Sequence, residues 1–309
     1  LSALRDETSR SAKRGSETYG ILSTPFNSMS VSGDTLRHGS HMVQADGVLY
    51  VAVNRSGFSP YIDAYESTTP YSFINRLTLA GTDQIGAMVS DGEYLYIARN
   101  GTNTQVSAID VRNPNAMTVR ATATSVLSRT ISTLALSRDR LYAPLYQGAA
   151  AVNDILVYDV STVQSAGTIT AATTIAGGAE GSITGVDVVG STIVFTMDDE
   201  IYAAPGYFLA IGTLSSNRDG GAGYTRKPLI TVSEPLQSPV IAGDNLYVAA
   251  NLGLQAWDLR GWWSSGGNIV QGGSVSLADP LRINNPVTLQ VEGPFAYLVG
   301  GTYRVFDLR

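Results

Sequence analysis

A short stretch recurs six times along this chain, and this recurrence constrains the fold more than any other feature of the sequence. Each copy joins a tight turn to a strand-like run such as Leu-Tyr-Val-Ala, and successive copies start about 45 to 53 residues apart. The copies are Asp46–Val53, Asp91–Ala98, Arg138–Leu145, Gly190–Met197, Gly243–Ala250 and Glu292–Val299. Self-similarity with this period is typical of β-propellers and of other repeat arrays.

Each repeat is predicted to contain four strands in the same order. An apolar strand such as Gly86–Ser90 precedes the turn, and the recurrent strand follows it. A third strand ends in an acid, as in Val106–Asp110, and a fourth, more polar strand returns, as in Met117–Thr122. β-branched and aromatic residues favour strands, while Gly, Asp and Asn close hairpins. No segment of ten or more residues keeps a helical period. The pattern predicts an all-β, six-bladed β-propeller of four-stranded blades.

The repeats also predict how the two ends of the chain are used. Residues 1–17 form an N-terminal arm or linker, and residues 18–309 form the propeller. The last repeat stops directly after its third strand, whereas residues 18–32 are a surplus segment ahead of the first repeat. We expect this segment to supply the outer strand of the last blade and so remove an exposed edge. The expected blades are residues 36–80, 81–126, 127–177, 178–233, 234–279, and 280–309 together with 18–32.

The acid that ends the third strand is a second recurrent feature. It is Glu66, Asp110, Asp159, Asp258 or Asp307 in five repeats, while the fourth repeat has Gly212 at this place. A ring of carboxylates could bind cations. An Asp at the end of a strand also accepts hydrogen bonds from the backbone of the following turn. Because the acid recurs beside loops of different sequence, we expect the turn-capping role.

Two repeats carry the pattern most clearly, in Asp110-Val-Arg-Asn-Pro114 and Asp159-Val-Ser161. The series of an apolar strand, a Gly turn, a Tyr-Val-Ala strand and a Leu-x-Val-x-Asp-Val-Ser strand resembles the LVIVD-type repeat of bacterial and archaeal β-propellers. The resemblance covers nearly the whole chain after residue 18. It implies a secreted or cell-surface protein without a known activity, and virion tail and fibre proteins also carry such propellers. The expected location is therefore extracellular, on a cell surface or in a virion.

Composition narrows the possible functions. Charged residues make up 15% of the chain, hydrophobic residues 44%, and the net charge is −6. Without a basic excess to neutralise phosphates, nucleic-acid binding is not expected. The chain has no Cys, which excludes disulfides, thiolate metal ligands and Cys nucleophiles. No apolar run approaches the roughly 18 residues of a membrane span.

Ligands of propellers usually bind at one mouth of the central channel, on the loops that enter the inner strands. The repeat alignment places arginines, acids and amides at this mouth. They could form a polar funnel for an anionic or sugar-like ligand, or they could pair with one another at a solvated mouth. The candidate ligand-binding residues are Arg37, His38, Asp83, Gln84, Arg129, Glu180, Gln237, Arg282 and Asn284, with Glu234 beside Gln237.

The sequence contains no recognisable catalytic arrangement. His38 and His41 alternate onto opposite sides of a predicted strand, so they are poorly placed to share a metal ion. No Gly-x-Ser-x-Gly turn is present for a serine nucleophile. We therefore expect a non-enzymatic protein without catalytic residues, metal or cofactor.

The connection Gly261–Gly267 is the candidate partner contact. It places Trp262 and Trp263 next to each other in a Gly- and Ser-rich segment that we interpret as a loop. Exposed aromatic rings suit a protein partner or carbohydrate stacking, but one ring could instead cover a blade interface. These features favour a structural or interaction module, a rigid propeller in a secreted, cell-surface or virion assembly. The alternative is a carbohydrate-binding or carbohydrate-active propeller that uses the channel mouth.

Deletion of residues 1–32 tests the predicted closure of the ring. Loss of an outer strand leaves the last blade incomplete and its edge exposed, so we expect a marked drop in the melting temperature. Thermal unfolding of the truncated and full-length chains, followed by circular dichroism, measures the difference. An unchanged melting temperature would count against closure by this segment.

Overall fold

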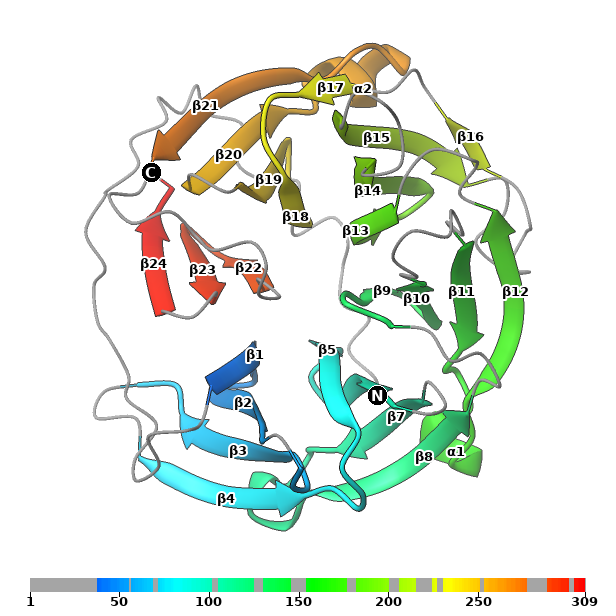
Figure 1. Cartoon of the computed structure of the whole chain (residues 1–309), viewed down its shortest axis with the longest axis vertical. Helices are drawn as coiled ribbons and strands as arrows, with labels where there is room; N and C mark the ends of the chain where they lie inside the picture. Colours follow the sequence, from blue (N-terminus) through cyan, green and yellow to red (C-terminus); the bar gives the residue numbers. More distant parts are fainter. Residues whose placement is uncertain are drawn as a thin grey trace.

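The computed structural model describes residues 38–55, 57–68, 72–101, 105–124, 130–145, 154–176, 182–199, 206–214, 224–226, 230–250, 253–276, 288–299 and 303–308. Six antiparallel sheets stand around a central axis like the blades of a propeller (Figure 1). The first strand of each sheet lies next to the axis, and later strands lie progressively farther out. The predicted all-β, six-bladed β-propeller is confirmed.

The first three blades follow one another along the chain. Blade 1 contains β1 (His38–Ala45), β2 (Val48–Asn54), β3 (Tyr61–Glu66) and β4 (Phe73–Thr78). Blade 2 contains β5 (Gln84–Ser90), β6 (Tyr94–Asn100), β7 (Gln105–Asp110), the 3₁₀ turn η2 (Pro114–Ala116) and β8 (Thr118–Thr124). Blade 3 contains β9 (Ala135–Ser137), β10 (Arg140–Pro144), β11 (Asp154–Asp159), α1 (Val163–Ala166) and β12 (Thr170–Ala176).

The other three blades complete the circle. Blade 4 contains β13 (Ser182–Val189), β14 (Thr192–Asp199), β15 (Gly206–Leu214), β16 (Tyr224–Arg226) and β17 (Ile230–Val232). Blade 5 contains β18 (Leu236–Ala242), β19 (Asn245–Ala250), β20 (Gly253–Asp258), α2 (Arg260–Ser265) and β21 (Val270–Ser276). Blade 6 contains β22 (Thr288–Glu292), β23 (Phe295–Val299) and β24 (Tyr303–Asp307).

Two blades depart from the four-strand pattern in the described part of the chain. The outer edge of blade 4 is split, because β16 pairs with the end of β15 and β17 pairs with its first half. Pro228 lies between the two pieces in the sequence, and a proline cannot donate a hydrogen bond to the sheet. Blade 6 shows three strands. The predicted arm, residues 1–17, and the predicted closing segment, residues 18–32, lie outside the described residues.

The recurrent turn has the geometry that its sequence predicts. In blade 1, Asp46 and Gly47 have φ angles of 47° and 77° between the paired ends of β1 and β2. Two successive positive φ angles are the mark of the two-residue hairpin turns whose twist matches that of the flanking strands. Asp tolerates this region of φ and Gly occupies it without steric cost, which explains the Asp-Gly pair at this turn.

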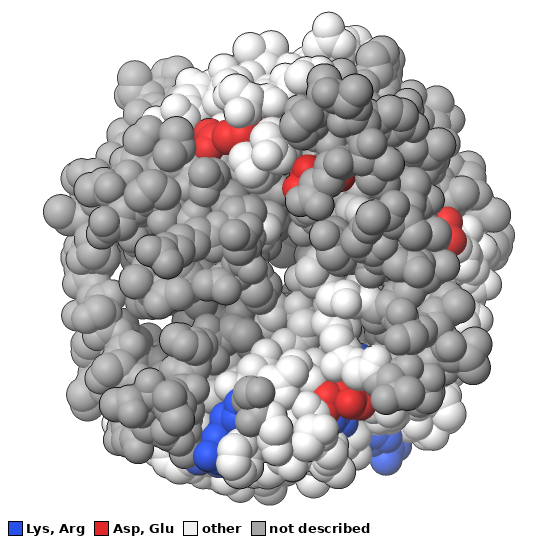
Figure 2. All heavy atoms as spheres, viewed as in Figure 1, with Lys and Arg blue, Asp and Glu red and all other residues white. Residues whose placement is uncertain are grey.

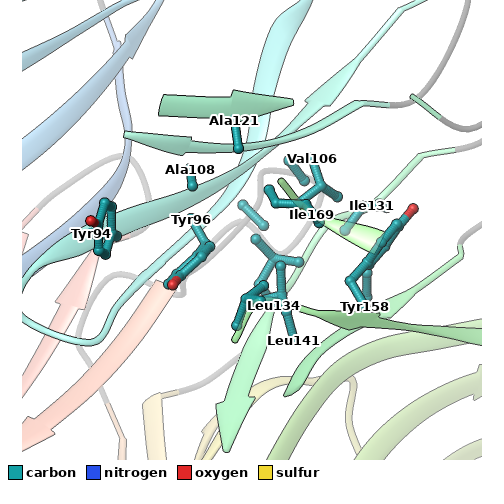
Figure 3. Close-up of a cluster of buried hydrophobic side chains, with 14 of the residues drawn as sticks. Tyr94, Tyr96, Val106, Ala108, Ala121, Ile131, Leu134, Leu141, Tyr158 and Ile169 are labelled. Atoms are coloured by element: carbon teal, nitrogen blue, oxygen red, sulfur yellow. The ribbon is translucent and has the colours of Figure 1, made fainter. Parts of the chain in front are cut away.

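The hydrophobic core is divided among the contacts between neighbouring blades. One cluster joins blades 2 and 3, where Tyr96 and Ala108 pack with Leu134, Leu141 and Tyr158 (Figure 3). Equivalent clusters join blades 1 and 2, 3 and 4, 4 and 5, and 5 and 6. Each sheet therefore covers its apolar face with the next sheet, and the free energy of apolar burial favours the whole array rather than any single blade.

Side-chain amides add hydrogen bonds at the same interfaces between blades. Asn54, the last residue of β2, donates to the carbonyl oxygen of Ile85 at 2.7 Å and accepts from its amide at 2.8 Å. One repeat later, Asn100 makes the same two contacts with Ile131, at 3.0 and 2.9 Å. Each Asn thus pairs with both main-chain groups of one residue in the next blade, within β5 for Asn54 and ahead of β9 for Asn100. The hydrogen bonds of Asn54 and Asn100 therefore help to set the positions of blades 1, 2 and 3 relative to one another.

Blade 6 meets blade 1 directly through its inner strand. The Gln290 side chain accepts from the amide of Gln44 at 3.0 Å and donates to its carbonyl oxygen at 3.2 Å. His41 Nδ1 and Thr288 Oγ1 share a hydrogen bond of 2.9 Å, and Tyr297 packs on the apolar cluster of blade 1. Residues almost the whole chain apart are therefore in contact, and the inner ring is continuous.

His41 at this joint makes the stability of the ring dependent on pH. Burial lowers the pKa of His41 from 6.5 to about 4. Above pH 6.5 the histidine is neutral in both states, and between pH 6.5 and 4 only the unfolded chain takes up the proton. The free energy of unfolding should therefore fall by about 3 kcal/mol as the pH drops through this interval.

Urea unfolding of the native chain and of a His41→Gln variant at pH 7 and pH 4.5 measures this effect. The carboxylates titrate equally in both proteins, so the difference between their two losses belongs to His41. Equal losses of stability would contradict the assignment.

Candidate functional site

The alternation of strand directions gives the ring two distinct faces. We call the side that carries the connections between second and third strands the 2–3 face, and the side that carries those between third and fourth strands the 3–4 face. The starts of the innermost strands also lie on the 2–3 face. Gln84, at the start of β5, shows this because its side chain donates to the carbonyl oxygen of Arg55 in the second connection of blade 1, at 3.2 Å.

The predicted channel mouth lies on the 2–3 face, and part of it is described. His38 is the first residue of β1, Gln84 the first of β5, and Gln237 the second of β18, so the fold brings these three positions to the same end of the ring. Asp83 precedes β5 and is half-buried. The remaining predicted mouth residues, Arg37, Arg129, Glu180, Arg282 and Asn284, lie outside the described residues. Ligand binding at this mouth stays a prediction.

Several described mouth residues make contacts with neighbouring strands and connections. Gln84 donates a second hydrogen bond, to the carbonyl oxygen of Thr82 at 2.8 Å. Glu234 accepts from the buried side chain of Gln255 at 2.8 Å. The carboxylate of Asp83 lies so close to Gly101 that a Cβ at that glycine would come within 2.0 Å of Asp83 Oδ1. These contacts fix the positions of the loops around the described part of the mouth.

The strand-ending acids cap turns on the 3–4 face. Asp110 Oδ1 accepts from the amide of Arg112 at 3.2 Å, and Asp258 Oδ1 accepts from that of Arg260 at 2.8 Å. Asp159 Oδ1 accepts from both the amide and the hydroxyl of Ser161, at 2.9 and 2.6 Å. Hydrogen bonds from the Arg112 and Arg260 side chains hold the pKa of Asp110 and Asp258 below the usual range. The predicted capping role is confirmed at these three positions.

The connections on the 3–4 face reach back to the preceding blade. Arg120 in blade 2 donates to the carbonyl oxygens of Val163 and Gln164 in α1 of blade 3, at 3.3 and 3.1 Å. In blade 5, Trp262 of α2 donates from Nε1 to Thr192 Oγ1 of blade 4 at 3.1 Å. The segment around Trp262, predicted as a loop, is a short helix that ends where Gly266 adopts a φ of 63°. A local turn of helix was not visible in the sequence because it is too short to show a period.

The two tryptophans therefore occupy different environments. Trp262 is only 7% exposed and packs with Leu246, Trp257 and Ile269 between blades 4 and 5. Trp263, the next residue, is 40% exposed. Trp262 therefore fits the alternative given by the sequence, in which one of the two rings covers the interface between blades. A partner contact at this connection stays a prediction, and Trp263 is the ring that the surface presents for it.

Four exposed apolar side chains lie at separate places around the 3–4 face, in blades 1, 2 and 5, and we call them the apolar rim. Phe73 begins β4, Val119 is the second residue of β8, Trp263 lies in α2 and Val270 begins β21. Phe73 is 56% exposed, Val270 is 63% exposed, and the Phe73 ring meets the Tyr65 ring edge-on at 5.7 Å. Among large apolar residues of the described chain, only Phe58 is comparably exposed on the 2–3 face.

Charge does not mark a binding surface among the described residues on the face shown in Figure 2. Figure 2 shows scattered small groups of acidic and basic residues and no extended area of one sign among the coloured atoms. The described residues contain no group of three or more His, Cys, Asp or Glu that could hold a metal ion. In the same ranges, no helix is long and apolar enough to cross a membrane.

Comparisons with known proteins support the fold alone. No protein-family model and no curated protein matches the chain, whereas 603 chains of solved structures do. The computationally designed protein Ika8 is similar over 87% of this chain and 83% of its own, with 11% identity and a TM-score of 0.51. Kluyvelomyces marxianus Hsv2 matches 77% of this chain and 72% of its own, with 10% identity and a TM-score of 0.47. The designed protein Ika4 matches 59% of this chain and 95% of its own, with 10% identity and a TM-score of 0.41.

Substitution of each tryptophan by Ala tests whether Trp262 stabilises the fold and Trp263 does not. Trp262→Ala removes a buried ring and its hydrogen bond, so we expect a loss of about 3–5 kcal/mol in the free energy of unfolding. Trp263→Ala removes a ring from the surface, and we expect a loss of about 1 kcal/mol or less. Urea unfolding of both variants gives the two values. Similar losses in the two variants would show that the rings do not differ as described.

Proposed function

We propose that this chain is a non-enzymatic interaction module, a rigid propeller subunit of a secreted, cell-surface or virion assembly, and that its partner is a protein. The propeller fold is consistent with such a role, since a ring of packed blades presents its connections in fixed relative positions. The observation that carries the proposal is the apolar rim on the 3–4 face. Phe73, at the start of β4, and Trp263, in α2, leave large aromatic surfaces in water.

Exposed aromatic rings on a fixed framework are suited to protein recognition. Aromatic residues are enriched at the centres of interfaces, where a few side chains supply most of the binding free energy. A surface that is already ordered loses less conformational entropy on binding than a flexible one. In this protein, Asp258 and Gly266 fix the two ends of the segment that carries Trp263, and the buried Trp262 anchors it to blade 4.

Membership of the LVIVD-type repeat class is part of this proposal. It is supported by the turn that follows β7, where Asp110 caps the chain and the Asn113 side chain accepts from the amide of Asn115 at 3.1 Å. Pro114 then begins the 3₁₀ turn η2. The Asp-Val-x-Asn-Pro sequence thus has a structural basis in this chain, as expected for a motif that defines architecture.

Protection of the apolar rim within the native assembly tests the proposal. The chain should be recovered from its source in a complex larger than its own 32.6 kDa. Hydroxyl-radical footprinting should then show that Phe73 and Trp263 are protected in this complex relative to the purified chain. Phe58, an exposed ring on the 2–3 face, is the internal control and should react equally in both samples. A free monomer, or protection of Phe58 alone, would overturn the proposal.

Variants of the same rings give the energetic test. A Phe73→Ser, Trp263→Ser double variant should weaken binding to the purified partner at least about tenfold, since the truncation of one central aromatic residue commonly costs 2 kcal/mol or more. A Phe58→Ser variant should bind as the native chain does. Calorimetric titration measures both affinities, and equal affinities for all three proteins would show that the apolar rim is not the contact surface.

A further inference from the structure

Asn100 combines a chemically reactive sequence with a structural role. It is followed by Gly101, and no other Asn in the chain precedes a Gly. The side-chain amide of Asn can be attacked by the main-chain nitrogen of the next residue, and a Gly at that place has no side chain to obstruct the attack. Asn100 is also the last residue of β6 and the residue that binds blade 3. The interface between blades 2 and 3 therefore depends on a reactive amide.

In the folded chain this amide is held at both of its polar ends. Nδ2 donates to the carbonyl oxygen of Ile131 at 3.0 Å, and Oδ1 accepts from the amide of Ile131 at 2.9 Å. Ile131 is fully buried within the apolar cluster that joins blades 2 and 3 (Figure 3). A Cβ on Gly86 of β5 would come within 2.0 Å of Asn100 Nδ2, so main chain lies directly against the amide. Gly101, in contrast, is exposed.

The reaction expected of this dipeptide is deamidation. The main-chain nitrogen of Gly101 gives up its proton and forms a bond to Cγ of Asn100, which becomes tetrahedral. The bond from Cγ to Nδ2 then breaks, the nitrogen leaves with the proton as ammonia, and a five-membered succinimide remains. Water opens this ring at either carbonyl and gives aspartate or isoaspartate. The two hydrogen bonds to Ile131 and the close approach of Gly86 oppose the first step, since they hold the amide planar and in place.

We propose that Asn100 is a site of spontaneous deamidation that the contact with blade 3 keeps unreactive, and that the reaction irreversibly weakens the interface between blades 2 and 3. The amide becomes reactive when this interface opens locally, and the free energy of that opening sets the rate. The product carboxylate has no hydrogen to donate, so the buried carbonyl of Ile131 loses its partner and faces a negative charge. Each opening can therefore be recorded as a covalent change.

Asn54 is a matched reference within the same chain. Its side chain makes the same two contacts with Ile85 of blade 2, at 2.7 and 2.8 Å. The residue that follows it is Arg55, whose side chain obstructs attack by the main-chain nitrogen. A comparison of Asn100 with Asn54 thus separates the effect of the following Gly from the effect of the contact between blades.

Deamidation rates in the native and unfolded chains test the proposal. Both samples are incubated at pH 8, one in buffer and one in guanidinium chloride, and peptide mass spectrometry follows the conversion of Asn100 and Asn54. In guanidinium chloride, Asn100 should convert at least about tenfold faster than Asn54, and a Gly101→Ala variant should remove most of this difference. In buffer, Asn100 should convert at least about tenfold more slowly than in guanidinium chloride.

Two results of this comparison would overturn the proposal. Equal rates at Asn100 in the native and unfolded chains would show that the contact with blade 3 does not protect the amide. Equal rates at Asn100 and Asn54 in guanidinium chloride would show that Gly101 does not activate the site. Neither result depends on the folding of a variant.

Cavities at two different interfaces test whether local opening controls the reaction. Leu134→Ala weakens the cluster between blades 2 and 3, and Leu246→Ala weakens the cluster between blades 4 and 5. In buffer, Asn100 should convert about tenfold faster in the Leu134 variant than in the Leu246 variant. Equal acceleration in both would show that only global unfolding exposes Asn100, and would contradict control by the interface. If either variant does not fold, the native rates above still decide.

An Asn100→Asp variant tests the effect of the reaction on stability. Loss of the donor to Ile131 should lower the melting temperature by about 2–6 °C. Asn115→Asp adds the same charge at an exposed position and should leave the melting temperature unchanged. Thermal unfolding followed by circular dichroism gives both values. Equal melting temperatures would show that deamidation at Asn100 does not weaken the ring.

Discussion

The structure depends on the inability of a single twisted four-stranded sheet to cover its own apolar faces. Each blade buries one face only when a neighbour lies against it, as Tyr96 of blade 2 does with Leu134 and Leu141 of blade 3. A linear stack of such sheets would leave two exposed ends. A closed ring removes both, and the contacts of Gln290 with Gln44 and of Thr288 with His41 are the place where it closes in the described chain.

Polar groups make these apolar contacts specific in distance and register. Asn54 and Asn100 each satisfy both main-chain groups of one residue in the next blade, Ile85 and Ile131. A buried main-chain group without a partner is costly, so a blade that slid along its neighbour would lose this pairing. Apolar burial supplies most of the stabilisation. The hydrogen bonds of the Asn side chains determine the position of each blade along its neighbour.

Function in such an architecture belongs to the connections, because the strands are committed to packing. On the 2–3 face, Gln84 contacts the second connection of blade 1, Glu234 contacts Gln255 of β20, and Asp83 lies against Gly101. On the 3–4 face, Phe73, Val119 and Val270 lie at or near the starts of outer strands and Trp263 lies in α2, all with exposed side chains. The second arrangement is the stronger candidate for a contact surface, since it combines exposed apolar area with a fixed backbone.

The sequence by itself determined the repeat, the order of strands, the number of blades and the capping acids. These features are local: a hairpin turn such as Asp46–Gly47, or an Asp that caps the next residue but one, depends on neighbouring residues and leaves its mark in their spacing. Only the tertiary structure decided the rest. Trp262 and Trp263 are adjacent and chemically identical, yet one is buried because Thr192 of another blade lies beneath it, 70 residues away in sequence. The split outer edge of blade 4 and the burial of His41 likewise arise from contacts between distant segments, which no local pattern records.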